Sequence, residues 1–176
     1  MISIEKPAIK DVRNIQKVFY ETWLATYPNE NAGVTTEDIE EKFKNRFSKQ
    51  AIQKRMDDIF DESENKLFLV AKDGALVVGV CKIVKKEYYD QLQAIYVLPK
   101  YQRRGIGKMF WNRVAEVIGN KKDIIVRVAT YNTKAINFYK KLGFADTGKR
   151  FSEENLRMPI SRSYIPEMEL IIKAVK

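Results

Sequence analysis

The stretch YQRRGIGKMF, residues 101–110, constrains the fold more than any other part of this sequence. It follows an apolar run that ends at Pro99, and it leads into a segment, 108–120, whose apolar residues recur at helical spacing. The prediction is a strand, a glycine-containing loop and a helix. The first turn of a helix has free backbone N–H groups, and glycine lets a ligand approach that backbone closely. Such a unit is suited to binding phosphate.

Basic side chains are concentrated around this loop. The 176-residue chain has a net charge of +9, and residues 100–150 carry 13 Lys/Arg against 3 Asp/Glu. This imbalance points to an anionic partner, either nucleic acid or a phosphorylated small molecule. The Walker spacing is absent, and Phe110 stands where the dinucleotide fingerprint needs its third glycine. The pattern that remains is Q-x-x-G-x-G over 102–107.

The residues that the chain lacks exclude several chemistries. There is no histidine, so Ser-His-Asp and Cys-His catalysis and histidine-ligated zinc sites are excluded. The one cysteine, Cys81, lies in an apolar run and is expected to be a small buried residue; we expect no metal site. No apolar run approaches the ~20 residues of a membrane span, and the N-terminus lacks a signal-peptide core. These features predict a cytoplasmic protein with no membrane partner.

Periodicity predicts an α/β domain over residues 1–176. The Asp-Gly turn at 73–74 indicates an early hairpin, and the alternation of strands and helices indicates an antiparallel sheet with at least one β-α-β crossover late in the chain. Strands are expected near 2–7, 66–71, 75–86, 91–98, 123–130, 143–151 and 167–173. Helices are expected at 12–26, 35–47, 48–60, 108–120 and 132–142, with Asp11, Thr35 or Thr36, and Ser48 as caps. The apolar faces are predicted to include Ile39, Phe43 and Phe47 in the second helix and Phe110, Val114 and Val117 in the fourth.

A second motif follows the loop at a characteristic distance. Residues 132–144 read NTKAINFYKKLGF, and the strand before the loop ends in Ile95-Tyr96-Val97. Together with Q-x-x-G-x-G, this combination resembles the GNAT superfamily of acyl-CoA-dependent N-acetyltransferases. The resemblance implies a single GNAT domain: a mixed, mostly antiparallel sheet flanked by helices, with one central β-α-β crossover.

The resemblance also implies roles for particular residues. Acetyl-CoA would be the co-substrate, with its pyrophosphate on the loop and its pantetheine arm between two diverging strands, 91–98 and 123–130. Tyr139 would lie near the thioester sulfur and protonate the leaving thiolate. The residues expected to bind acetyl-CoA are Ile95, Tyr96, Val97, Gln102, Arg103, Arg104, Gly105, Ile106, Gly107, Lys108, Asn132, Ala135 and Tyr139.

The base that deprotonates the acceptor amine is not identified by the motifs. Many relatives carry glutamate on the strand before the loop, but the corresponding positions here are Gln91 and Gln93. The acids nearby in the sequence or in the acceptor region are Glu87, Asp90, Glu21 and Glu30. Because most carboxylates are solvated, water-mediated deprotonation is the expectation.

The run ETWLATY, residues 21–27, resembles polyamine acetyltransferases of the PaiA type, which acetylate spermidine and spermine. Glu21, Trp23 and Tyr27 would suit a cationic, partly aliphatic amine. The same residues would suit a peptide N-terminus or a protein lysine, so that alternative stays open.

Two further alternatives belong to other classes of protein. A nucleic-acid-binding module would also be basic, but Trp111 lies on a helix that must pack, and we expect no nucleic-acid partner. A GNAT fold that binds acyl-CoA without turnover is the other alternative, motivated by Gln91 and Gln93. A homodimer through a sheet edge is compatible with the predicted fold.

Overall fold

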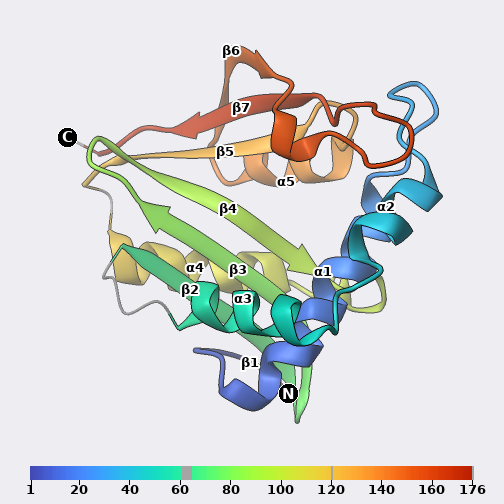
Figure 1. The fold of residues 1–176 in the computed structure, drawn as a ribbon. Helices are drawn as coiled ribbons and strands as arrows, with labels where there is room; N and C mark the ends of the chain where they lie inside the picture. Colours follow the sequence, from blue (N-terminus) through green and yellow to red (C-terminus); the bar gives the residue numbers. More distant parts are fainter. Residues whose placement is uncertain (61–64, 120, 176) are drawn as a thin grey trace.

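The computed structural model describes residues 1–60, 65–119 and 121–175 (Figure 1). Its strands are β1 Ile2–Glu5, β2 Lys66–Asp73, β3 Leu76–Lys85, β4 Tyr89–Val97, β5 Asp123–Ala129, β6 Ala145–Phe151 and β7 Glu167–Ile172. Its α-helices are α1 Val12–Thr26, α2 Thr36–Phe43, α3 Lys49–Ile59, α4 Ile106–Ile118 and α5 Thr133–Lys141. Three short 3₁₀ helices are η1 Ile9–Asp11, η2 Pro99–Tyr101 and η3 Glu154–Leu156.

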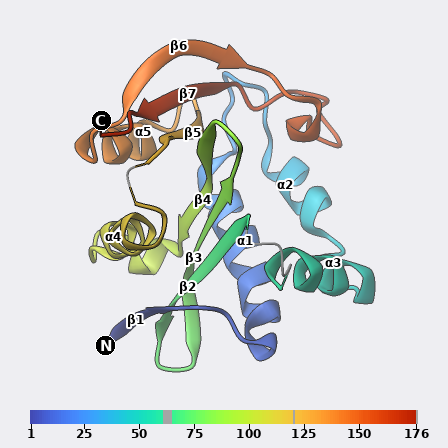
Figure 2. The same ribbon diagram turned by 90° about the vertical axis from the view of Figure 1, so that its left-hand side faces the viewer.

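The strands form one seven-stranded sheet in the order β1-β2-β3-β4-β5-β7-β6. Every neighbouring pair in it is antiparallel except β4 and β5, which are parallel and joined through α4. Helices α4 and α5 cover one face, and α1, α2 and α3 cover the other (Figure 2). The predicted fold class, a mostly antiparallel sheet with a central β-α-β crossover, is confirmed.

The main core lies between the sheet and the helices. Ile106, Phe110 and Val114 of α4 pack into it, with Phe110 fully buried. The prediction that Val117 joins them is wrong, because its side chain is exposed. The helix begins two residues earlier than predicted, so Ile106 supplies the additional apolar contact, while the predicted end at Asn120 falls outside the described residues. Cys81 is buried in this core, as expected, and burial raises the pKa of its thiol.

Two local predictions also need correction. The second helix was expected to reach Phe47, but α2 ends at Phe43, and Phe47 lies beyond it as a largely exposed side chain. Asp11 precedes α1 without making a side-chain cap; its carboxylate instead accepts from the Ala8 N–H at 2.8 Å and pairs with Lys72 Nζ at 2.7 Å. The Thr35 and Ser48 caps are confirmed.

Candidate active site

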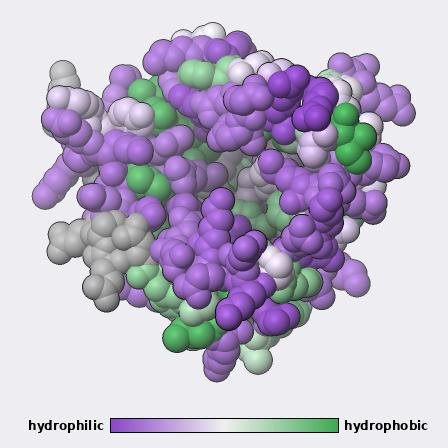
Figure 3. Space-filling view, in the orientation of Figure 1, coloured by the Kyte–Doolittle hydropathy of each residue, from purple (hydrophilic) through white to green (hydrophobic). Residues whose placement is uncertain are grey.

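The sheet opens between its two parallel strands. β4 and β5 pair only from Tyr89–Leu92 with Asp123–Val126, and beyond that point they diverge (Figure 1). Residues Ile95–Val97 remain paired with β3 on one side, but the edge that faces β5 has no strand partner there. The space-filling view is hollowed at its centre, with hydrophobic residues inside the hollow (Figure 3). An unpaired edge in the middle of a sheet can bind an extended amide-containing ligand through backbone hydrogen bonds.

The loop after β4 presents its backbone N–H groups. Arg103 and Gly105 both have positive φ, 64° and 79°, and Gly105 is the N-cap of α4. The first bonded N–H of the helix is that of Met109, which donates to Gly105 O at 3.0 Å. Among the described residues, no backbone acceptor lies against the N–H groups of residues 103–108. With the positive end of the α4 dipole behind them, these groups form an anion-binding concavity.

Two contacts hold the loop in place. Gln102 Nε2 donates to Val97 O at 3.0 Å, so this side chain closes the turn between β4 and α4. The Gly107 backbone packs against α5, because a Cβ at this position would lie 3.0 Å from the Phe138 ring. Glycine is therefore favoured at 107 by the close approach of the Phe138 ring and at 105 by its positive φ. Arg103, Arg104 and Lys108 remain exposed around the loop.

Tyr139 is held by α5 beneath this opening. Asn132 caps the helix by accepting from the Ala135 N–H at 3.1 Å, which accounts for both of these motif residues locally. The Tyr139 ring is buried against Phe138 and Phe144, with ring centroids 5.2 and 5.6 Å apart. Burial raises the pKa of its hydroxyl well above the ordinary value of a tyrosine. A neutral phenol is therefore available as a proton donor.

Two tyrosines meet at the end of α1. The Tyr27 hydroxyl lies 3.1 Å from the Tyr96 hydroxyl of β4, and burial raises the pKa of both. The Trp23 ring packs on Tyr27 with centroids 4.6 Å apart. Its indole N–H lies near enough to Tyr96 to favour the ionised phenol, but makes no hydrogen bond of normal geometry to any described residue. The Tyr131 hydroxyl donates to the backbone oxygen of Tyr27 at 2.8 Å and so holds the end of α1 against the segment after β5.

The predicted acids lie elsewhere. Glu21 points away from Trp23 and Tyr27 and pairs with Lys17 at 3.6 Å, because it occupies a different face of α1. Glu30 is exposed in the following loop. Asp90 lies at the opposite, closed end of β4, where that strand still pairs with β5.

Glu167, the first residue of β7, was not singled out from the sequence and lies at this corner. It is half-buried and interacts electrostatically with Tyr27 and Tyr96. Desolvation, followed by repulsion from Glu153, raises the pKa of its carboxyl to about 7, against an opposing effect of Arg127. Alternation along EMELIIK places Glu167 on one face of a strand, but only the pairing with β5 reveals which side chains that face meets.

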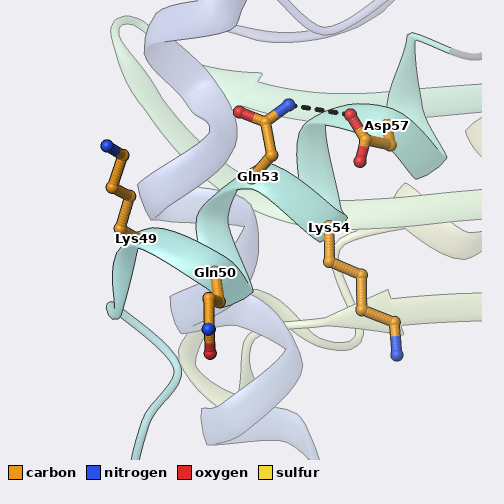
Figure 4. Close-up of a pocket in the computed structure, with 5 residues that line it drawn as sticks. All are labelled: Lys49, Gln50, Gln53, Lys54 and Asp57. Atoms are coloured by element: carbon orange, nitrogen blue, oxygen red, sulfur yellow. Dashed lines mark hydrogen bonds between the residues drawn. The ribbon is translucent and has the colours of Figure 1, made fainter.

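The described residues also include a shallow depression on α3, distant from this opening. Its lining consists of side chains from a single helix, and Gln53 Nε2 donates to Asp57 Oδ1 at 2.8 Å (Figure 4). The remaining lining residues are Lys49, Gln50 and Lys54. No second element contributes to it, so it lacks the convergent polar groups of a catalytic site.

Comparison with known families identifies the family to which the chain belongs. Residues 23–159 match the model of the acetyltransferase (GNAT) domain family. The chain belongs to this family. It is an acetyl-CoA-dependent N-acetyltransferase.

Individual relatives agree with this assignment. The chain is 30% identical over 149 residues to the spermidine N(1)-acetyltransferase of Thermoplasma acidophilum, which covers 81% of this chain and 88% of that one. Over 57 residues it is 46% identical to the thialysine N-epsilon-acetyltransferase of Mus musculus, or 31% of this chain and 34% of the other. The crystal structure of PaiA N-acetyltransferase from T. acidophilum in complex with coenzyme A superposes with a TM-score of 0.71, at 22% identity and with 99% of each chain covered.

No helix among the described residues is both long and apolar enough to span a membrane. No group of three or more potential metal-ligating side chains was found in the same residues.

Proposed function

We propose that this GNAT domain, spanning residues 1–176, transfers an acetyl group from acetyl-CoA to a primary amine of a polyamine such as spermidine, by direct attack in a ternary complex. The observation that carries the proposal is the opening between β4 and β5, whose unpaired edge includes Tyr96 of the Tyr27–Tyr96 pair and leads directly into the anion-binding loop. This arrangement allows a phosphorylated thioester and an amine to approach the same point from opposite sides.

In this proposal, acetyl-CoA binds along the opening. The N–H groups of residues 103–108 take the pyrophosphate, and Arg103, Arg104 and Lys108 add charge around it. The pantetheine amides pair with the free edge at Ile95–Val97. Asn132 and Gln102 act mainly by holding α5 and the loop in place, since their side chains are engaged there.

Tyr139 is proposed as the proton donor to the leaving thiolate. Burial keeps its hydroxyl neutral, and its ring is fixed by Phe138 and Phe144. Expulsion of a thiolate is favoured when a phenol within reach protonates it. Phe138 separately fills the packing role against Gly107.

The acceptor is proposed to enter beside Trp23 and Tyr27. Aromatic faces favour a cation with aliphatic segments, and Lys42 already lies 5.4 Å from the Trp23 ring centroid, so that ring accepts a cation in this structure. The polyamine assignment draws its support from the relative named as a spermidine acetyltransferase at 30% identity.

The test is the release of free thiol from acetyl-CoA with spermidine, spermine, an aminoglycoside, and peptides with free N-termini or lysines. Turnover that depends on spermidine is the expected result, and turnover with peptides alone would overturn the polyamine assignment. Tyr139→Phe should lower kcat by about 10²-fold or more, with little change in melting temperature. The matched control is Tyr88→Phe, at a tyrosine that is 80% exposed. Equal kcat values for the two variants would contradict the role of Tyr139.

A further inference from the structure

The sheet pairing determines the face on which Glu167 lies. Glu167 is the antiparallel partner of Ala129 at the end of β5 and of Phe151 at the end of β6. Directly paired residues project to the same face of a sheet. Ala129 belongs to the apolar cluster that includes Trp23 and Tyr27. Glu167 therefore lies on the face covered by the end of α1, next to the side chains proposed to receive the acceptor.

The charged groups around Glu167 leave its carboxylate without an ion pair. Arg127 of β5 is a cation that acts on Glu167, but it is paired with Glu153 and lies 3.9 Å from Glu169. The charge of Glu167 raises the pKa of two hydroxyls, that of Tyr27, which follows α1, and that of Tyr96 in β4. Its backbone pairs in the sheet, but among the described residues the Glu167 carboxylate makes no hydrogen bond or ion pair. A half-buried carboxylate without a partner requires a cation or a proton.

The reaction requires a proton acceptor at the same place. A primary amine has a pKa of ~10.4, so it reaches the active site as an ammonium at neutral pH. The chain has no histidine, so a carboxylate is the side chain best suited to take that proton. A carboxyl with a pKa of about 7 is better matched to the ammonium than an ordinary glutamate, because a general base works best near the operating pH.

We propose that Glu167 is the general base that takes a proton from the acceptor ammonium, beside the Tyr27–Tyr96 hydroxyl pair; this rests on the proposed transfer to an amine. One N–H proton moves to the Glu167 carboxylate, and the freed lone pair forms a bond to the thioester carbonyl carbon. The C–S bond then breaks, and Tyr139 donates its proton to the thiolate. The second proton of the nitrogen replaces the one lost from Tyr139, and the proton on Glu167 passes to solvent.

The other carboxylates near the opening fit this role less well. Glu169 is buried and faces Lys149 at 3.3 Å, so its charge is already compensated. Glu153 is paired with Arg127. Glu21 and Glu30 point to solvent or to a lysine away from the opening.

The experiment is the pH profile of kcat/KM for whichever amine the wild type acetylates, measured for the wild type, Glu167→Gln, Glu167→Asp and the control Glu154→Gln. Glu154 is an exposed glutamate paired with Arg157 at 3.2 Å, outside the proposed site. The wild type and the control should show a limb that rises through about pH 7. Glu167→Gln should lose that limb and about 10²-fold or more of kcat/KM at pH 8, mostly in kcat, while acetyl-CoA affinity and melting temperature stay unchanged. Glu167→Asp should retain part of the activity.

A Glu167→Gln variant with an unchanged limb, or a loss confined to KM, would overturn the inference. Acetylation of an amine other than spermidine would refute the polyamine proposal alone, since Glu167 is then tested on that amine. If the wild type acetylates no amine, a ¹³C NMR titration of the glutamate carboxyls tests whether Glu167 has the pKa that the inference requires. A signal with a pKa near 7 that disappears in Glu167→Gln supports the inference, and a Glu167 signal that titrates near 4.5 refutes it.

Discussion

Replacing Asp38 with asparagine tests how the loop before β7 is held onto α2. Asp38 is fully buried, and its Oδ1 accepts from the N–H groups of Ile160 and Ser161 at 3.0 and 2.9 Å. Its Oδ2 accepts from the Thr35 N–H at 2.9 Å and the Thr35 hydroxyl at 3.2 Å. One carboxylate therefore closes the capping box of α2 and fixes a segment more than 120 residues away in sequence.

The size of the effect follows from the pKa of this carboxyl. Burial alone would raise it, but hydrogen bonds from Ser161, Thr35 and Ile160 outweigh burial and lower the pKa from 3.8 to about 2. At 1.36 kcal/mol per pH unit, the carboxylate contributes about 2 kcal/mol to the free energy of unfolding. Asparagine at 38 would leave an N–H of Thr35 facing an NH₂ group, a loss of similar size. We expect Asp38→Asn to lower the free energy of unfolding by about 2 kcal/mol at pH 7, or the melting temperature by roughly 4–8 °C.

The assay is urea denaturation of both proteins across pH. Because the folded-state pKa is depressed, the contribution of Asp38 is fully present above the unfolded value of 3.8 and is lost as the pH falls through about 2. The gap between wild type and variant should stay constant from pH 7 to pH 5 and fall to about half at pH 3. The control is Asp57→Asn, where an exposed carboxylate accepts from Gln53, with an expected change within about 0.5 kcal/mol. A gap below 0.5 kcal/mol at pH 7 for Asp38→Asn, or one that persists at low pH, would refute the reasoning.

Two predictions concern the loop of residues 103–108, which is proposed to bind the pyrophosphate of acetyl-CoA. Gly107→Val should lower the free energy of unfolding by about 1–3 kcal/mol and weaken acetyl-CoA binding, because its Cβ would lie 3.0 Å from the Phe138 ring and displace the start of α4. Thermal unfolding measures the stability and calorimetry measures the binding. Unchanged values for the variant would contradict the close packing of residue 107 against Phe138. Arg103→Gln and Arg104→Gln should each weaken acetyl-CoA binding several-fold without altering the melting temperature, and the loss should shrink at 0.5 M salt because exposed charges are screened. A loss that does not depend on salt would argue against the electrostatic role.

Much of the fold was predictable from local patterns. The Asp-Gly turn before β3 and the caps at Thr35 and Ser48 each appear where the sequence predicts them. Boundaries failed where tertiary packing overrides periodicity. Phe47 has the spacing of an α2 core residue, yet the helix ends at Phe43, and Arg46 lies over the Phe47 ring at 5.0 Å on the surface.

The sequence by itself determined the family and the end of the site where acetyl-CoA is proposed to bind. Residues 102–107 contain the glycine that begins α4, and residues 132–144 contain the Asn132 cap and the buried Tyr139 ring. Each set lies in one short segment, so its arrangement is set by local backbone geometry. The acceptor end depended on the tertiary structure. Tyr27 follows the last residue of α1, Tyr96 lies in β4 and Glu167 in β7, and only the sheet order, with β7 between β5 and β6, brings them together. No spacing along the chain encodes that meeting, because strand neighbours are chosen by packing across the whole sheet. The pKa of Glu167 has the same origin, since it reflects burial and a neighbouring Glu153 rather than any property of the residue itself.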